Sequence, residues 1–275
     1  MISTILRPYE SVIASSVGHI TVHEAGAIES TGHKINAIDT KDGKLKVSDI
    51  QSVLDMHTDE HMVKPKLVFI SNSTELGSIY TKKELTDISH FCKIHQLYLY
   101  LDGARLGSAL TSEANDLTLA ELAQLVDIFY IGWTKNGALC WEAIVIMNDD
   151  LKENFRYCMK QKGALLAKSR LLWLQFLTFF QDDLFFSLAK HANTMASRLV
   201  EGIRKQSYSF LSTPVSNQIF PILPNELIER MSEKYLFYVW QSIDSKHSAI
   251  RLVTSWATKE EAVNQFIADL SWNMY

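Results

Sequence analysis

The chain has 275 residues, 47% hydrophobic and 21% charged, which is typical of a globular protein with one large domain or two smaller ones. Its formal net charge of −4 offers no overall attraction to nucleic acids or acidic membranes, so a small-molecule partner is expected. The three cysteines lack CxxC or zinc-type spacing, which argues against a disulfide framework and a structural metal site. The start, MISTILRPYESV, is not a signal peptide, and no apolar stretch is long enough to span a bilayer. We therefore expect a cytoplasmic protein.

Four short apolar segments of the first half are predicted to be β-strands. They lie at 67–70, 97–101, 128–131 and 143–147, and they lack the polar alternation of a strand with one solvated face. Continuous apolar strands are typical of a parallel sheet covered by helices on both faces.

Between these strands lie helical patterns with recognisable start signals. Thr81 and Thr118 are each followed three residues later by a glutamate, Glu84 and Glu121, in the arrangement of a capping box. Alternating strands and helices predict an α/β fold with a mainly parallel sheet sandwiched by helices.

The second half has a different pattern. Residues 151–207 are predicted to be helical, 218–223, 236–241 and 249–257 are strand-like, and a helix is expected from Asn225. A third capping-box pattern, Thr258 with Glu261, is expected to open the last helix. The sequence therefore predicts a large domain at 1–160, followed at 161–275 by connecting helices and a small C-terminal α/β domain.

Polar side chains follow three of the predicted strands. Asp102 and Arg105 follow the strand at 97–101, Lys135 follows the strand at 128–131, and a polar run that includes Glu75 follows the strand at 67–70. The carboxyl ends of parallel strands bind ligands in open α/β folds, so these groups are expected in one cleft. Taken singly, Asp102 could start a turn, Arg105 could pair with it on the surface, and Lys135 could be a solvated loop tip. No dinucleotide or P-loop glycine motif accompanies these strands.

His19 and His23 are four residues apart and are followed by Glu24. This spacing could place two metal ligands on one helical face, but the order is not HExxH and the sequence shows no third ligand. Ordinary polar packing is the favoured interpretation for His23, and no metal is expected.

Four segments in the correct order resemble the threonine aldolase and aromatic amino acid β-eliminating lyase family of pyridoxal-phosphate (PLP) enzymes. They are GHITVHEAGAIESTGHKI at 18–35, LDGARLG at 101–107, TKNGA at 134–138 and IRLVTSWA at 250–257. The resemblance covers about 4–270. It implies an aspartate-aminotransferase-like fold with a large PLP domain and a small C-terminal domain. It also implies a homodimer or homotetramer with sites at subunit interfaces.

The resemblance also implies roles for the cofactor-binding residues. Lys135 would bond covalently to PLP, Asp102 would pair with its pyridine nitrogen, and His19 would stack on its ring and help to move protons. A partly desolvated lysine has a lowered pKa and a reactive amine, which suits this task. Arg105 would lie beside the cofactor, and Thr134 would lie next to the lysine.

By the same resemblance, Arg251 would bind the substrate carboxylate, for which a planar bidentate donor is suited. The alternative is that Arg251 is a strand residue whose side chain faces solvent. Glu75 stands where many aldolases carry a histidine that assists deprotonation of the substrate hydroxyl. Glutamate could serve as that base, although specificity for threonine becomes uncertain.

Family members normally begin about sixty residues or more upstream, before a glycine- and threonine-rich turn that holds the PLP phosphate. The resemblance places Met1 after that turn and matches residues 1–10 to the helix that follows it, with Lys168 or Arg170 as possible substitute phosphate contacts. The expected activity is cleavage of a β-hydroxy amino acid, of threonine or allo-threonine type, to glycine and an aldehyde. The alternatives are β-elimination on another amino acid and a catalytically impaired member without a full phosphate site.

Overall fold

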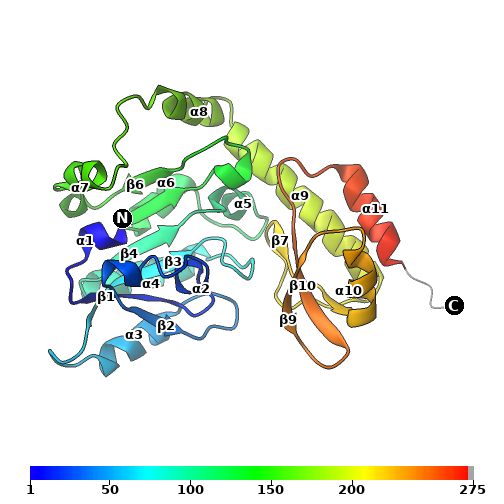
Figure 1. Cartoon of the computed structure of the whole chain (residues 1–275), viewed down its shortest axis with the longest axis horizontal. Helices are drawn as coiled ribbons and strands as arrows, with labels where there is room; N and C mark the ends of the chain where they lie inside the picture. Colours follow the sequence, from blue (N-terminus) through cyan, green and yellow to red (C-terminus); the bar gives the residue numbers. More distant parts are fainter. Residues whose placement is uncertain (272–275) are drawn as a thin grey trace.

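The computed structural model describes residues 1–271 and contains two β-sheets joined through a long helix, α9 (Leu184–Lys205) (Figure 1). The last four residues of the expected second domain, 272–275, lie outside this description. Figure 1 shows α9 running from the side of the large sheet to the side of the small one. Within residues 1–271, no helix is both long and apolar enough to cross a membrane.

The large sheet is formed by six strands of the first half of the chain. They are β1 (Glu10–Ser15), β2 (Ile35–Ile38), β3 (Lys64–Ser71), β4 (Tyr98–Asp102), β5 (Ile128–Ile131) and β6 (Ala143–Ile146). Their order is β2-β1-β3-β4-β5-β6, and all neighbours are parallel except β5 and β6. The expected α/β class with a mainly parallel sheet is confirmed.

Both faces of the central strands are buried. Ile13, Val68 and Ile70 belong to one apolar core, while Val12 and Phe69, which alternate with them, belong to a second core on the opposite face. Successive side chains of a strand point to opposite faces, so the middle of each of these strands is apolar at consecutive positions. The segment at 143–147 was expected to be covered in the same way, and this is wrong: β6 is an antiparallel edge strand with Ile144 exposed.

The helices of the first half surround this sheet. They are α1 (Ile2–Ile5), α2 (His19–Val22), α3 (Val47–Met56), α4 (Lys82–Ile94), α5 (Leu106–Leu110) and α6 (Leu119–Leu125), with 3-10 turns at η1 (Glu29–Thr31), η2 (Thr134–Asn136) and η3 (Asp149–Leu151).

Two of the three predicted capping boxes are present. The hydroxyl of Thr81 accepts the N–H of Glu84 at the start of α4, and Thr118 does the same at the start of α6. The third is wrong, because α11 (Glu260–Leu270) has Lys259 at its N-cap, while Thr258 accepts the backbone N–H of Ser255 at 2.8 Å.

The predicted helical region 151–207 contains three helices. They are α7 (Phe155–Gln161), α8 (Arg170–Gln181) and α9. The breaks coincide with Gly163 and Asp183, whose backbones have positive φ values of 70° and 53° and therefore cannot continue a right-handed helix.

The small sheet is antiparallel and is built around its longest strand. Its members are β7 (Gln218–Ile219), β8 (Ile222–Pro224), β9 (Tyr238–Ser242) and β10 (His247–Val253), and α10 (Asn225–Ser232) follows β8 directly. β10 pairs with the other three strands, and its buried face packs with α9, α10 and α11. The expected single strand at 218–223 is wrong, because the chain divides it at Phe220 and Pro221, and proline has no N–H for a sheet ladder.

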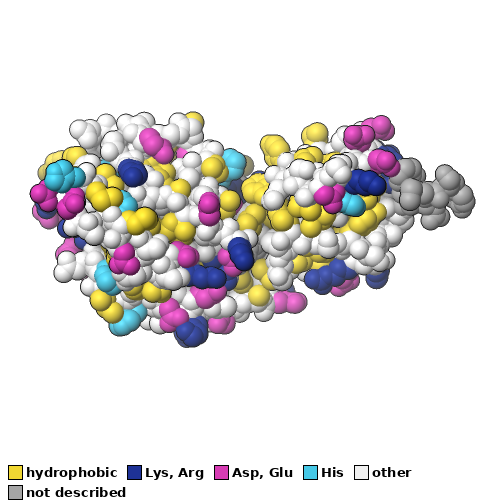
Figure 2. All heavy atoms as spheres, turned by 90° about the horizontal axis from the view of Figure 1, so that it is seen from below, with side chains coloured by type: hydrophobic (Ala, Val, Ile, Leu, Met, Phe, Trp, Pro, Cys, Tyr) yellow, Lys and Arg dark blue, Asp and Glu magenta, His cyan; other side chains and the backbone are white. Residues whose placement is uncertain are grey.

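On the face drawn in Figure 2, lysine and arginine side chains are interspersed with aspartate and glutamate. This distribution agrees with the small net charge of the sequence.

Candidate active site

One cavity of about 660 Å³ lies at the carboxyl end of the large sheet, and residues of the small sheet complete its wall. Ser71 and Asp102 end the neighbouring strands β3 and β4 and are paired in register. Six of the seven predicted site residues line this cavity: His19, Glu75, Asp102, Arg105, Lys135 and Arg251. The structure therefore brings together groups that are up to 232 positions apart in the chain, from 19 to 251.

Asp102 is a buried carboxylate held by the backbone around it. Its Oδ1 atom accepts the N–H of Ala104 at 2.9 Å, and its own carbonyl accepts the N–H of Asn72 at 2.9 Å. Tyr130 of β5 lines the same cavity, and burial, followed by the Asp102 charge, raises the pKa of that tyrosine. These contacts fix the carboxylate at the strand end with oxygen lone pairs still available to a ligand.

Lys135 lies on the 3-10 turn η2, directly after β5. Two contacts fix this turn to the helices that follow it. The side chain of Asn136 donates to the carbonyl of Phe185 at 2.7 Å, and the ring centroids of Trp133 and Phe176 lie 4.8 Å apart in an edge-on arrangement. The Nζ atom makes no hydrogen bond or ion pair with any residue of 1–271. Desolvation lowers the pKa of Lys135, and the Arg105 charge lowers it further, which favours the neutral, nucleophilic amine.

Two arginines face the same cavity from the two sheets. Burial, followed by repulsion from Arg251, lowers the pKa of Arg105 to about 10. The guanidinium of Arg105 has no hydrogen-bond or ion-pair partner in the described part of the chain. Arg251 lies on β10, donates from Nη2 to Oε1 of Gln218 at 2.5 Å, and is 5.7 Å from the ring centre of Trp240. Its Nε atom is buried and has no hydrogen-bond partner among the described residues. Both groups retain unsatisfied N–H donors for an anion.

Glu75 and His19 are joined at the entrance to α2. The carboxylate of Glu75 accepts the hydroxyl of Ser71 and the backbone N–H of His19, both at 2.8 Å. Burial raises the pKa of Glu75, and the Asp102 charge acts in the same direction. The Nδ1 atom of His19 is 2.5 Å from Oε1 of Glu24, and the ring of His23 lies 5.1 Å from the His19 ring.

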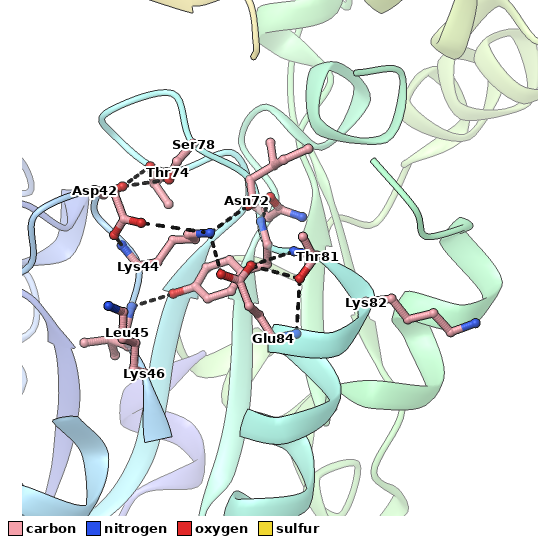
Figure 3. Close-up of polar contacts among 12 residues, drawn as sticks. Asp42, Lys44, Leu45, Lys46, Asn72, Thr74, Ser78, Thr81, Lys82 and Glu84 are labelled. Atoms are coloured by element: carbon pink, nitrogen blue, oxygen red, sulfur yellow. Dashed lines mark hydrogen bonds and ion pairs between the residues drawn. The ribbon is translucent and has the colours of Figure 1, made fainter. Parts of the chain in front are cut away.

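A polar network that includes Thr74 and Ser78 anchors the loop that carries Glu75 (Figure 3). The carbonyl of Asp42 accepts the hydroxyls of Ser78 at 2.6 Å and Thr74 at 3.2 Å. The nearby Lys44 amine donates to Glu84 at 2.6 Å and to the carbonyl of Ile79 at 3.3 Å. Because these bonds tie the loop to residues 42–44, in the connection between β2 and α3, Glu75 is presented on a rigid support.

Thr134 is exposed and does not line the cavity. Its hydroxyl donates to Oε1 of Glu142 at 2.8 Å, so its predicted cofactor contact remains a prediction. Lys168 and Arg170, considered as phosphate contacts, are exposed near the start of α8 and do not line the cavity. Residues 1–10 were expected to resemble one helix, but only Ile2–Ile5 is helical and β1 begins at Glu10.

Sequence reasoning missed Tyr130, Gln218 and Trp240, which also line the cavity. Tyr130 is an aromatic residue within an apolar strand and gave no polar signal. Gln218 is a polar residue at the start of QIFPIL. Its burial in the structure, with only 2% exposure, is what indicates a functional or structural role.

The cavity fits PLP by its donors and acceptors and by its size. It offers an amine without a partner among residues 1–271, a buried carboxylate for a pyridine N–H, and two guanidinium groups that are incompletely bonded within the same residues. Its volume is in the range of small-molecule sites, roughly 300–1,000 Å³. Lys135 would hold the cofactor covalently and Asp102 would bind the ring nitrogen.

This arrangement is typical of a PLP enzyme of the α/β class. It combines a buried carboxylate at the end of β4 (Asp102), a lysine after β5 (Lys135) and an arginine from the second sheet (Arg251). The family model described as Beta-eliminating lyase matches residues 1–224. The chain belongs to this family, whose members depend on PLP.

Individual relatives agree with this assignment. The Pseudomonas aeruginosa protein "Low specificity L-threonine aldolase" is 33% identical over 273 residues, which cover 98% of this chain and 78% of the relative. The solved structure of Leishmania major threonine aldolase superposes with a TM-score of 0.95 at 50% identity, covering 98% of this chain and 78% of that one. A putative aromatic amino acid beta-eliminating lyase/threonine aldolase from Exiguobacterium has a TM-score of 0.71 at 18% identity, over 94% of this chain and 74% of that one, and it supports the fold alone.

Proposed function

We propose that this chain is a PLP-dependent aldolase that cleaves L-threonine or L-allo-threonine to glycine and an aldehyde. Relatives at 33% and 50% identity that carry the threonine aldolase name support it. The observation that carries the proposal is the convergence of Lys135, Asp102 and Arg251 on one cavity.

The residues of the cavity divide the work of this reaction. Lys135 would hold the cofactor through its amine, Asp102 would accept the N–H of the cofactor ring, and Arg251 would bind the substrate carboxylate through its N–H groups. When bound, PLP supplies an electron sink for the pair released at Cα when the Cα–Cβ bond breaks. Glu75 takes the proton of the β-hydroxyl, whose oxygen becomes the aldehyde carbonyl, and return of this proton to Cα completes glycine. A carboxylate with a raised pKa is better matched to this transfer near neutral pH.

His19 and its neighbours complete the proposed site. The pair with Glu24 holds the His19 ring over the cavity, where it would stack on the cofactor and move protons at its free nitrogen. Arg105 would lie beside the cofactor and balance its anionic groups. We also propose Thr134 as a cofactor contact. To make this contact, its hydroxyl would have to rotate away from Glu142.

The test is glycine release from L-threonine and L-allo-threonine by the PLP-loaded chain, with acetaldehyde measured in parallel. Lys135→Ala should abolish release, because the nucleophilic amine is gone, while Lys93→Ala, at an exposed position of α4 outside the cavity, should behave like the wild type. Failure of the wild type to release glycine, or full activity in Lys135→Ala, would contradict the proposal.

Two alternatives predict different products or a different cofactor preference. A β-eliminating lyase acting on another amino acid would release ammonia and a keto acid, and the aromatic wall of Tyr238 and Trp240 favours a larger substrate side chain. A catalytically impaired member is favoured by the few cations in the described cavity wall, which are Lys135, Arg105 and Arg251. Lys135 and Arg251 have other tasks, so Arg105 alone would balance the anionic groups of the cofactor, including its phosphate. Equal affinity for pyridoxal and PLP would support impairment, because the phosphate would then contribute nothing to binding.

We further propose a cytoplasmic homodimer or homotetramer with domains at 1–160 and 161–275. Exposed apolar side chains near the Lys135 turn support assembly, including Leu139 with 92% exposure and Trp173 with 60%. Light scattering of the purified chain measures the oligomeric state, and limited proteolysis near residue 160 tests the division.

A further inference from the structure

The side chain of Gln218 connects Arg251 with the loop that carries Glu75. Gln218 begins β7, is 2% exposed, and lines the cavity. Its Oε1 atom accepts Nη2 of Arg251 at 2.5 Å, while its Nε2 atom donates to the carbonyl of Thr74, the residue before Glu75, at 3.1 Å. The small sheet and the Glu75 loop are therefore joined through one amide.

The loop also touches β7 through its backbone. Gly77 has a φ of +77°, and a Cβ atom built on it would lie 2.6 Å from the carbonyl oxygen of Gln218. Only glycine combines this φ with so close an approach, which holds the loop against the strand. The Glu75 loop therefore meets Gln218 at two places: the carbonyl of Thr74 at the side-chain amide, and Gly77 at the backbone carbonyl.

The two bonds of Gln218 fix the orientation of its amide. In the opposite orientation the NH₂ group would face the guanidinium and the oxygen would face the Thr74 carbonyl, so both contacts would be repulsive. Trp240 supports the guanidinium at 5.7 Å, and the buried Nε atom of Arg251 stays without a partner. A neutral group therefore positions Arg251 and leaves its charge for a ligand.

We propose that Gln218 is a positioning residue that aims Arg251 at the substrate carboxylate and couples it to the Glu75 loop, and that its neutrality is essential. This inference rests on the proposed function for the identity of the ligand. A glutamate at this position would form an internal ion pair with Arg251 and compete with the substrate for the same donors. It would also leave the carbonyl of Thr74 without its donor.

The test uses the PLP-loaded full chain and two ligands, glycine and glycinamide, which differ by the carboxylate. Calorimetric titration should show that the wild type prefers glycine. Gln218→Glu should weaken glycine binding by roughly 10- to 100-fold with little effect on glycinamide, since a charge-assisted contact is lost to the internal competitor. Gln218→Met, which removes both bonds without adding charge, should weaken glycine binding only a few-fold.

Gln241→Glu is the matched control, because Gln241 is exposed on β9 and the substitution adds the same charge outside the cavity. It should bind glycine like the wild type, and circular dichroism should show that all variants are folded. In threonine cleavage, Gln218→Glu should raise KM more than it lowers kcat, because substrate binding is affected before chemistry.

The outcomes separate this inference from the proposed function. If the wild type prefers glycine and Gln218→Glu loses that preference, the inference stands even when threonine is not cleaved. If Gln218→Met is impaired as much as Gln218→Glu, or if Gln218→Glu keeps its preference for glycine, the inference is overturned while threonine cleavage is untouched. A wild type that does not distinguish glycine from glycinamide also overturns it, because Arg251 would then bind no carboxylate.

Discussion

The backbone N–H of His19 donates to Oε1 of Glu75 at 2.8 Å, across a separation of 56 residues. The bond joins the start of α2, which follows β1, to the loop that follows β3, its neighbour in the sheet. It places the proposed base beside the proposed stacking histidine and draws on a main-chain donor, which does not change with pH. A proton at Glu75 therefore alters the charge of the site without releasing His19 from its position.

Glu75→Gln should lower kcat for threonine cleavage by roughly 100-fold or more, because a general base is removed. The base acts in its ionised form, and burial raises the pKa of Glu75, so wild-type activity should fall as pH decreases through a value above the ordinary 4.5. The variant should lack this acidic limb in a pH–rate profile. Glu113→Gln, at an exposed position, should keep both the rate and the limb.

The stability of Glu75→Gln serves as a control on folding. Glu75 has a higher pKa in the folded chain than in the unfolded chain. As pH rises through this folded-state pKa, the unfolded chain ionises more readily, and the free energy of unfolding therefore decreases. The amide oxygen can still accept from Ser71 and His19. The variant should therefore unfold at the same urea concentration as the wild type at neutral pH, or higher, and earlier unfolding would show that the activity loss has a structural cause.

Asp102→Asn should weaken PLP binding by roughly 10- to 100-fold, because the ring N–H loses a charged acceptor. The amide fits the same space and can still accept from Ala104, so the fold should be kept. Equilibrium dialysis of PLP measures the effect. Asp55→Asn, on the exposed face of α3, is the matched control, and equal affinities in the two variants would remove Asp102 from the cofactor site.

The sequence allowed the strand ends to be predicted because their physical causes are local. An apolar run with both faces buried, followed by Asp102 or Lys135, marks a covered parallel strand and its carboxyl end. The role of Gln218 could not be predicted in this way, because its partners Thr74 and Arg251 are 144 and 33 residues away and meet it only after the sheets have formed. The false cap at Thr258 has a similar cause, since a turn with Ser255 competes for the same hydroxyl.

The capping box of α4 offers a test of local stability that is independent of the cavity. Thr81→Ala removes the hydroxyl that accepts the N–H of Glu84, and it should lower the free energy of unfolding by about 1 kcal/mol. Thr86→Ala, on the exposed face of the same helix, should change it by less than about 0.5 kcal/mol. Urea denaturation measures both, and similar values for the two variants would mean that the box contributes little.

Gly103→Ala should disrupt the site through the backbone. A Cβ atom built on Gly103 would lie 1.9 Å from the carbonyl oxygen of Tyr130, so β4 and β5 would have to separate where one ends in Asp102 and the other leads to Lys135. We expect a loss of about 2 kcal/mol or more in the free energy of unfolding, as for overpacked cores, together with loss of glycine release.

Gly32→Ala is the control for this change. Gly32 has a φ of +86° but open space around it, so the substitution should cost only about 1 kcal/mol for the left-handed backbone and leave activity unchanged. Urea unfolding and the glycine assay are measured for both variants. If Gly103→Ala is no less stable and no less active than Gly32→Ala, the close approach of the two strands is not what holds Asp102 and Lys135 in place.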